Sequence, residues 1–345
     1  MIEYNYLLND IMFSKASNIV SLKLFLFIII ALLSSLVIDI IFGELPTRIH
    51  PVVIIGSIIS FFKNVLIRFK SKLSGLMAVI GVCIVSSVIL YVIYLICSFN
   101  AILWFIVFTI LLSSTFSIRM LLSTAVDVKD ALDESIDKAR EMVSYLVSRN
   151  TDELTEGFIV SAVIESLTEN ITDSYVAPVF YYFIFTLIIF KYPFNDCLYF
   201  LLLIPMLYRI SNTMDAMLGY KTEELINIGY VPAKIDDILN YIPARISGLC
   251  MVISSYLINL DGKNAYRIMR RDARNCPSPN SGYTMATTAG ALNIQLIKKE
   301  TYILGDDDKS ITSDDIQKAV NLSKMTILLF TIMIILLFII LYVIL

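Results

Sequence analysis

Long apolar stretches dominate this chain and restrict the folds open to it. Four runs, at residues 20–42, 75–97, 101–122 and 324–345, reach the length of about 20 residues that a helix needs to cross a bilayer. Inside lipid the backbone must satisfy its own hydrogen bonds, and helices do so within one segment. The sequence therefore predicts an all-α, polytopic helical membrane protein.

The composition agrees with this class. Hydrophobic residues make up 57% of the 345 residues and charged residues only 17%, against about 25% charged in an ordinary soluble domain. The net charge of −3 gives no reason to expect nucleic-acid binding. One histidine cannot form a His-cluster metal site, and the five cysteines lack the C-x-x-C spacing of zinc and redox motifs.

Shorter apolar runs set the expected number of crossings. Runs at 174–190 and 197–210 are expected to form a hairpin, whereas those at 52–62 and 246–260 look too short to cross alone. We expect five to seven transmembrane helices plus re-entrant or interfacial ones, within a single integral membrane domain over residues 1–345.

Positive charge predicts the orientation. Four Lys and Arg residues lie within residues 63–72, whereas the turn at 98–100 carries no charge. The positive-inside rule places the first segment in the cytoplasm and the turn outside. The polar segments 123–173 and 262–323 then lie on the cytoplasmic face of the cell membrane, where we expect the site. Within the first of them, residues 124–149 have the pattern of one amphipathic helix.

An acidic helix face is the first candidate for chemistry. Glu165, Glu169 and Asp173 are spaced at i, i+4 and i+8, so they share one face of a helix. Like charges at this spacing destabilise a helix by about 0.2–0.5 kcal/mol per pair, so the face favours a bound cation. This pattern predicts a divalent metal site at the bilayer surface.

Residues 39–56 join two apolar runs through an irregular backbone, because Pro46 and Pro51 cannot continue a helix interior. Irregular backbone at membrane depth is tolerated where it lines a cavity. The candidate pocket residues are Asp39, Glu44, Arg48 and His50. A charged interfacial loop in which Arg48 pairs with Glu44 is the alternative.

Three further polar segments carry candidates for phosphate binding. Each has a plainer reading, as a helix cap, a surface turn or an anchor to lipid headgroups. The candidates are Asn212, Asp215 and Lys221 in the first segment, Asp236, Asp237, Asn240 and Arg245 in the second, and Ser278 and Asn280 beside four arginines in the third. A loop of hydroxyls, Asn and Gly near arginines is suited to an anion.

Taken together, these segments resemble one family. FGELPTRIHPVVIIG, ESLTENITDSYVAPVFYY, NTMDAMLGYKTEE, AKIDDILNYIPARISG, PSPNSGY and GDDDKSITSDDIQKAV occur in this order. The chain closely resembles the adenosylcobinamide-phosphate synthase family of cobalamin (vitamin B12) biosynthesis over roughly residues 30–322. The resemblance implies a membrane ligase that joins adenosylcobyric acid to (R)-1-aminopropan-2-yl phosphate, or a related amino alcohol, as an amide. It further implies ATP and Mg²⁺, with the lipid bilayer and other cobalamin-synthesis membrane enzymes as partners.

Residues that match family motif positions receive roles as hypotheses. The matching positions are Asp39, Glu44, His50, Glu165, Glu169, Asn170, Asp173, Asn212, Asp215, Lys221, Asp236, Asp237, Asn240, Arg245, Ser278, Asn280 and Gly290. Glu165, Glu169 and Asp173 are assigned to Mg²⁺. Lys221 and Arg245 are assigned to phosphates, with Asn170, Asn212, Ser278 and Asn280 also on the ligand side. Asp215 or His50 would handle the proton of the amine, and Asp236 and Asp237 complete the catalytic set.

Two features leave other readings open. The family often has Pro-Glu where this chain has Thr284 and Met285. One carboxylate is therefore missing after the loop Ser278-Pro279-Asn280, the SPN loop. Charged residues near membrane helices also mark transport paths. A corrinoid-binding or transport protein without enzymatic activity is therefore the alternative function.

Overall fold

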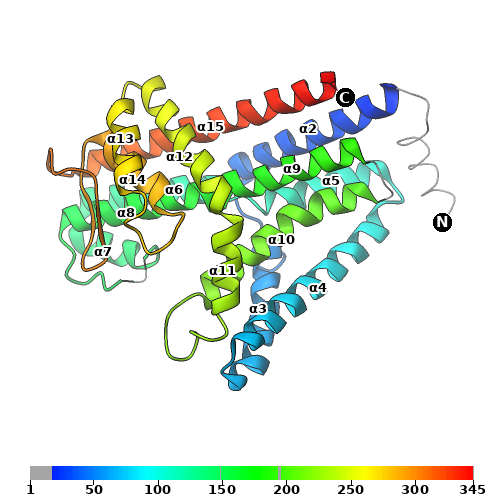
Figure 1. Ribbon diagram of the computed structural model, residues 1–345, viewed down its shortest axis with the longest axis horizontal. Helices are drawn as coiled ribbons and strands as arrows, with labels where there is room; N and C mark the ends of the chain where they lie inside the picture. The colour runs from blue at the N-terminus through cyan, green and yellow to red at the C-terminus, as the bar shows by residue number, and fades with distance from the viewer. Residues whose placement is uncertain (1–17, 148, 193–195, 345) are drawn as a thin grey trace. The chain divides into compact units, whose positions relative to one another are not determined.

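The computed structural model describes residues 18–147, 149–192 and 196–344 (Figure 1). Nearly all of these residues are helical, and the described part of the chain contains a single antiparallel hairpin, β1 (Leu296–Lys298) with β2 (Tyr302–Leu304). The all-α prediction is therefore confirmed.

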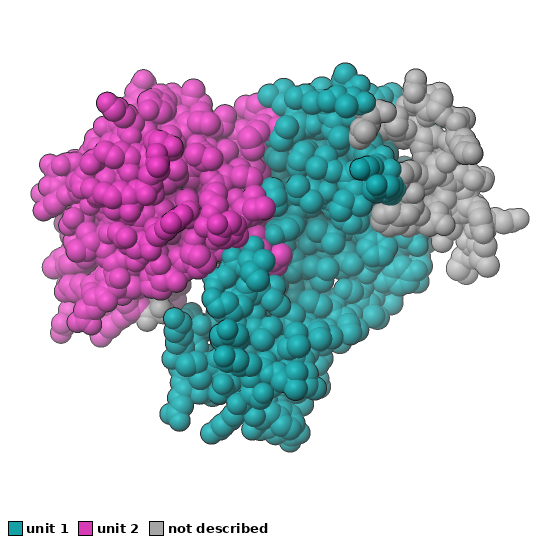
Figure 2. Space-filling model, viewed as in Figure 1, with its two compact units in different colours: residues 1–117, 178–238, 334–345 teal, residues 118–177, 239–333 magenta. Residues whose placement is uncertain are grey.

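The chain forms two compact units (Figure 2). Unit 1 comprises residues 1–117, 178–238 and 334–345, and unit 2 comprises residues 118–177 and 239–333. Unit 1 contains α2 (Asn18–Phe42), α3 (Pro51–Leu66), η1 (Ile67–Phe69), α4 (Lys72–Cys97), α5 (Ala101–Ser113), most of α9 (Ala177–Lys191), α10 (Cys197–Leu218) and most of α11 (Tyr230–Leu239). Unit 2 contains α6 (Ile118–Glu134), α7 (Ile136–Ser144), α8 (Glu156–Ile171), the π-helix η2 (Thr172–Val176), α12 (Tyr241–Leu257), α13 (Gly262–Asp272), α14 (Gly282–Leu292), the hairpin and the first part of α15 (Ser313–Ile344).

Seven helical segments in the described residues are long and apolar enough to cross a membrane, or eight if the bent pair α11–α12 counts as one crossing. The multi-pass class is thus confirmed. The expectation that residues 52–62 are too short is wrong on length, because α3 and η1 together run through Pro51–Phe69. The run at 246–260 belongs to α12, which follows α11 at a bend of 46°.

In unit 1, α2 and α5 pack side by side and run in the same direction. Phe27 contacts Phe105 and Phe108 at ring-centroid distances of 5.6 and 5.1 Å, and Ser35 Oγ donates to the Thr109 carbonyl at 3.0 Å. Residue numbers rise together along both helices, as parallel helices require. The carboxyl ends of α2 and α5 therefore lie at the same end of this helix pair.

In unit 2, α8 lies at the centre of an apolar core. Ile159, Val163 and Leu167 on α8 are buried together with residues of α6, α7, α14 and the hairpin. The single amphipathic helix expected over 124–149 is wrong, because it is broken between α6 and α7 at Ser135. The Ser135 hydroxyl accepts from the Lys138 amide at 3.2 Å and caps α7, a competing role that serine often takes at helix starts.

Candidate functional site

In unit 1 the irregular segment between α2 and α3 is organised by His50 and Glu44. His50 Nδ1 accepts the Val52 amide at 3.2 Å and so caps α3, while His50 Nε2 lies 2.6 Å from Glu44 Oε2. Ser117 Oγ donates to the other oxygen of Glu44 at 2.7 Å. Both ring nitrogens of His50 are therefore engaged, and the partner of Glu44 is His50 rather than the Arg48 considered from the sequence.

The electrostatics favour an ionised Glu44. Burial alone would raise the pKa of Glu44, but the hydrogen bonds from His50 and Ser117 outweigh it and lower the pKa below its ordinary value. The charge of Arg209 on α10 acts in the same direction. Glu44 is thus a fixed anion at the edge of this cluster.

Helix α10 continues the polar cluster. Arg209 Nη1 donates to Asn212 Oδ1 at 3.1 Å, and Asp215 follows three residues later on the same face. A Cβ at Gly219 would lie 2.1 Å from Asp215 Oδ1, so the glycine makes room for this carboxylate. Asp215 also interacts electrostatically with Asp237 of α11.

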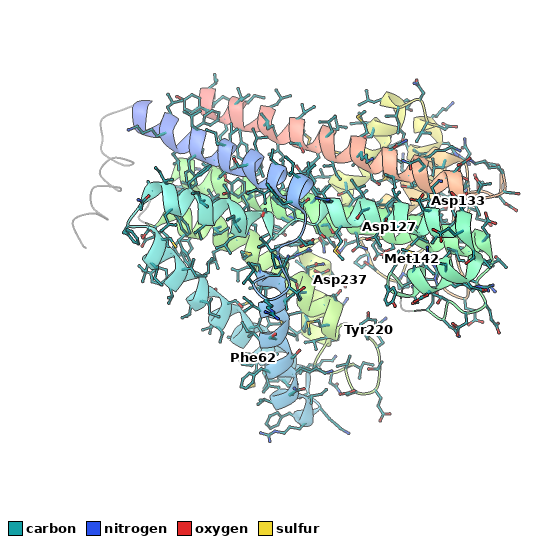
Figure 3. All side chains as sticks on the ribbon, turned by 180° about the vertical axis from the view of Figure 1, so that it is seen from behind. Phe62, Asp127, Asp133, Met142, Tyr220 and Asp237 are labelled. Atoms are coloured by element: carbon teal, nitrogen blue, oxygen red, sulfur yellow. The ribbon has the colours of Figure 1, made fainter. Side chains whose placement is uncertain are left out.

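The remaining candidates of unit 1 differ in exposure. Lys221 is exposed in the segment after α10, next to Tyr220, and Asp237 on α11 pairs with Lys234 at 2.9 Å (Figure 3). Asp236 is buried, and so is Asn240, which belongs to unit 2. The adjacent aspartates therefore have different surroundings, as their helical spacing predicts.

In unit 2 the carboxylate of Glu165 is buried and already surrounded by donors. Ser161 Oγ donates to one oxygen at 2.6 Å, and Tyr302 OH and Arg149 Nη2 donate to the other at 2.8 and 3.1 Å. The Ile297 amide in turn donates to Ser161 Oγ at 2.9 Å. Glu165 thus joins α8 to the β1–β2 hairpin, and its assignment to a metal stays a prediction.

The helix that carries the acidic face changes from an α-helix to a π-helix between Glu169 and Asp173. The α-helix ends at Ile171 and η2 begins at Thr172, so Glu169 and Asp173 lie on either side of an α-to-π junction. Single π-turns inside α-helices are frequent at functional sites. Both carboxylates are half-buried, whereas Glu165 is 4% exposed. Asn170 donates to the carbonyl of Ser166 at 2.8 Å, within its own helix.

Three groups that the sequence did not predict as site residues lie around Glu165 and Glu169. The negative charges of Glu165 and Glu169 act on Tyr302 and Cys276, and Arg149 forms an ion pair with Glu165. Burial and the Glu165 carboxylate raise the pKa of Tyr302, and burial raises the pKa of Cys276 to about 12, so both stay neutral. Tyr302 is an isolated tyrosine in a short hairpin and belongs to no sequence motif. The sequence alone therefore gives no reason to select it as a site residue.

Arg245 orders the SPN loop. Its Nη1 donates to the carbonyl of Tyr241 and to Asn280 Oδ1 at 2.6 and 3.0 Å, and its guanidinium stacks on the Tyr241 and Tyr283 rings at 3.4 and 4.3 Å. Ser278 Oγ accepts the Asn280 amide at 3.2 Å within the same turn. These contacts give Arg245, Ser278 and Asn280 a positioning role, and their phosphate contacts stay a prediction.

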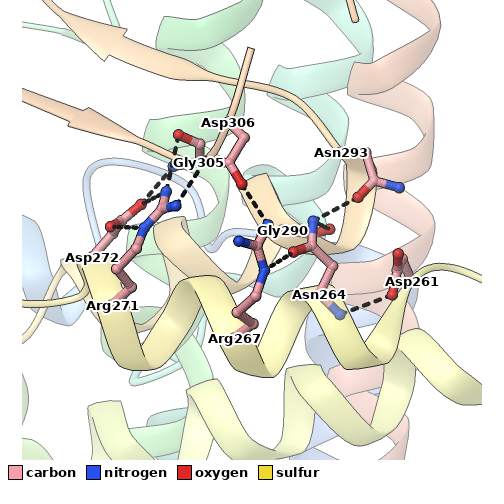
Figure 4. Close-up of polar contacts among 9 residues, drawn as sticks. All are labelled: Asp261, Asn264, Arg267, Arg271, Asp272, Gly290, Asn293, Gly305 and Asp306. Atoms are coloured by element: carbon pink, nitrogen blue, oxygen red, sulfur yellow. Dashed lines mark hydrogen bonds and ion pairs between the residues drawn. The ribbon is translucent and has the colours of Figure 1, made fainter. Parts of the chain in front are cut away.

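The arginines of α13 and of the turn after it divide into two sets, of which Figure 4 shows Arg267 and Arg271. Arg271 donates to Asp272 and Asp306 at 2.7 Å each, and Arg267 also pairs with Asp306, so these two cations are used to attach β2 to α13. Arg270 and Arg274 are exposed. The cations best placed for an anion in this unit are therefore the second pair.

The predicted three-carboxylate metal site is not formed by the side chains alone. Among the residues that the structure describes, no three His, Cys, Asp or Glu side chains are grouped as a metal site requires. The carboxylate of Glu165 is hydrogen-bonded to Ser161, Tyr302 and Arg149, whereas Glu169 and Asp173 are half-buried on either side of the α-to-π junction. Their assignment stays a prediction.

Met285 occupies the position at which the family often has a glutamate, and it lies beside Tyr302. The Met285 side chain is fully buried, and Tyr302 OH lies 3.7 Å from its sulfur. Thr284 is buried as well, at 1% exposure. In this chain the position is therefore part of an apolar wall next to Tyr302.

Comparison with known proteins places the chain in a family. The family model described as CobD/Cbib protein matches residues 32–323. A probable cobalamin biosynthesis protein CobD of Methanothermobacter thermautotrophicus is 43% identical over 302 residues, which cover 87% of this chain and 94% of the relative. The corresponding protein of Methanothrix thermoacetophila is 37% identical, covering 84% and 90%.

A bacterial relative shows the same similarity. The cobalamin biosynthesis protein CobD of Dehalococcoides mccartyi is 34% identical over 287 residues, covering 81% of this chain and 87% of the relative. No solved structure matches the chain. Because the family model spans every polar cluster described above, the chain belongs to the CobD/Cbib family, the cobinamide-phosphate synthases of cobalamin biosynthesis.

Proposed function

We propose that this protein joins the propionate carboxylate of adenosylcobyric acid to (R)-1-aminopropan-2-yl phosphate, or a related amino alcohol, as an amide. The observation that carries the proposal is the family match over residues 32–323, which contains both polar clusters. Those clusters supply carboxylates and cations of the kinds that a reaction between two anionic substrates needs.

The chemistry requires activation of the carboxylate, because a carboxylate ion is a poor electrophile. Transfer of the terminal phosphoryl group of ATP to the propionate oxygen would give an acyl phosphate and ADP. Attack by the amine nitrogen would then form the C–N bond and release inorganic phosphate and one proton. Positioning and charge stabilisation dominate catalysis of such phosphoryl transfers.

The residues for Mg²⁺ are Glu169 and Asp173. Mg²⁺ keeps several waters and is held in such sites by one or two carboxylates together with substrate phosphates, which fits two half-buried carboxylates at a π-junction. When bound, the ion neutralises phosphate charge. Within unit 2, Arg270 and Arg274 are exposed cations for the phosphates, while Arg245 holds the SPN loop in shape. Lys221 of unit 1 is exposed and stays a separate phosphate candidate.

The proton of the amine is assigned to Asp215. An aliphatic amine is protonated near neutral pH and must lose a proton before it attacks. The sequence offered Asp215 or His50 for this step. His50 already uses Nδ1 on the Val52 amide and Nε2 on Glu44, so Asp215 is the better-placed base.

The decisive experiment uses the purified full-length protein in lipid with adenosylcobyric acid, aminopropanol phosphate, ATP and Mg²⁺. We expect amide product with stoichiometric phosphate release. Glu169→Gln and Asp173→Asn should each lower turnover by at least about 100-fold, in the range seen for lost electrostatic stabilisation. Glu141→Gln, which changes an exposed carboxylate on α7, is the matched control.

Two results would count against the proposal. Corrinoid binding without amide product or nucleotide turnover would favour the binding or transport function. Wild-type turnover in both Glu169→Gln and Asp173→Asn at limiting Mg²⁺ would remove these residues from the metal site while leaving the reaction itself intact.

A further inference from the structure

Unit 1 contains a cavity that the proposed reaction does not use. Its volume is about 150 Å³, and it is bounded by α3, α4, α5 and α10. Of its thirteen lining residues, Ser86 is the only polar one. An engineered apolar cavity of about this volume stays dry and binds benzene, so the space accommodates on the order of six carbon atoms.

The cavity is lined in part by exposed apolar side chains. Its lining includes Ile49, Ile54 and Ile89, whose side chains are 61%, 43% and 42% exposed. Val53 and Val88, exposed neighbours on α3 and α4, extend this apolar surface beyond the cavity. Since α4 and α10 are each long and apolar enough to cross a membrane, we take this exposed apolar side of the cavity to face the bilayer.

Water is a poor occupant for this space. A buried water needs two to four polar partners, and the lining offers only the Ser86 hydroxyl. Ser86 Oγ is buried and makes no hydrogen bond among the described residues. Serines in membrane helices usually bond to the carbonyl four residues earlier, as Ser57 does to Val53 at 3.1 Å. The Ser86 hydroxyl is thus one unsatisfied polar group in a wall whose other twelve residues are apolar, and hydrocarbon matches that majority of the wall.

We propose that this cavity holds a segment of one hydrocarbon chain of a bilayer lipid, on the order of six carbon atoms long, as a saturable, structural ligand. Ile49 and Pro51 in the lining flank His50 in the chain. The bound chain thus packs against the turn that carries the His50–Glu44 pair and supports its conformation. The site is separate from amide formation, so its occupancy is measured without any enzymatic assay.

The test compares an added ring inside the cavity with the same ring outside it. Ser86→Phe fills the cavity, whereas Val88→Phe places a phenyl group on the lipid-facing side of the same helix. The purified proteins are exchanged into detergent and titrated with palmitoyl-oleoyl phosphatidylglycerol, and bound lipid is counted by native mass spectrometry. Wild type and Val88→Phe should each retain one saturable lipid, and Ser86→Phe should lose occupancy at least tenfold.

A second filling variant protects the test against misfolding. Ile58→Phe fills the cavity from α3 and should lose the lipid in the same way. Lipid uptake that does not saturate in wild type would overturn the proposal. So would wild-type occupancy in both filling variants, or a wild-type protein whose cavity keeps only the detergent and never the lipid.

Discussion

For Glu165, the role predicted from the sequence differs from the role that its neighbours in the structure indicate. The sequence places it on an acidic face and assigns it to a metal. The structure surrounds its carboxylate with Ser161, Tyr302 and Arg149. Removing one member of a buried ion pair leaves the other charge without a partner, which is more costly than losing the attraction itself.

We therefore expect Glu165→Gln to lower the free energy of unfolding by about 3 kcal/mol, the low end of the range for buried pairs. The low end applies because the Arg149 side chain is 17% exposed. Tyr302→Phe removes one hydrogen bond to the carboxylate and should cost about 1–2 kcal/mol. Thermal unfolding of the detergent-solubilised variants measures both.

A double variant separates this account from a metal role. Glu165→Gln combined with Tyr302→Phe should destabilise by less than the sum of the single changes, because the two residues share one bond. Unchanged stability of Glu165→Gln, together with a higher Mg²⁺ concentration for half-maximal turnover, would instead return Glu165 to the metal site.

At the scale of elements, the hairpin is attached to α13 by a charged network. Asp306 accepts from Arg271 and Arg267, and the Gly305 amide donates to Asp272 at 2.8 Å. The hydrogen bonds from Arg271 and Arg267 lower the pKa of Asp306 below 3.8. A carboxyl whose pKa is depressed on folding stabilises the folded state above its unfolded pKa, and this stabilisation is lost as pH falls through the folded pKa.

Asp306→Asn should consequently melt at a lower temperature than wild type near neutral pH. The difference should persist down to about pH 4 and shrink below it, as the wild-type carboxyl becomes protonated. Thermal unfolding at a series of pH values is the measurement. Asp307→Asn, an exposed neighbour, is the control and should match wild type throughout. A difference that is the same at about pH 3 and pH 7 would refute the electrostatic explanation.

At the scale of the whole molecule, two arguments predict the orientation of the chain in the membrane. Positive charge places residues 63–72 inside and 98–100 outside. Because α2 and α5 are parallel and Ser117 bonds to Glu44, the start of α3 lies on the side to which α5 leads, away from the 98–100 turn. We therefore expect both ends of α3 on the inner side, so that α3 would not cross although it is long enough.

Cysteine labelling tests this arrangement. Arg48→Cys and Lys70→Cys should react with a membrane-impermeant maleimide only in inverted vesicles, and Phe99→Cys should react in intact cells. Labelling of wild type is subtracted, because its five cysteines are buried or half-buried. Opposite accessibility of Arg48→Cys and Lys70→Cys would mean that α3 crosses the membrane.

Several elements could be predicted from the sequence, because the residues that specify them are close together in the chain. The Asn100 turn was one, and its side chain caps α5 by accepting the Ile102 amide at 2.9 Å. The break at Ser135 was missed because amphipathic periodicity continues across it, and only the cap separates α6 from α7. The π-helix at Thr172–Val176 was missed for a similar reason, since its register depends on packing against α6 and α12.

The sequence by itself determined the membrane class, the helical content and the family, because apolar run length and motif order are properties of consecutive residues. Only the tertiary structure decided which polar side chains are already engaged. Glu165, His50, Arg245 and Arg271 all find hydrogen-bond partners, several of them far away in the chain. Buried charges require such partners, and the partner depends on which segments fold together rather than on spacing along the chain.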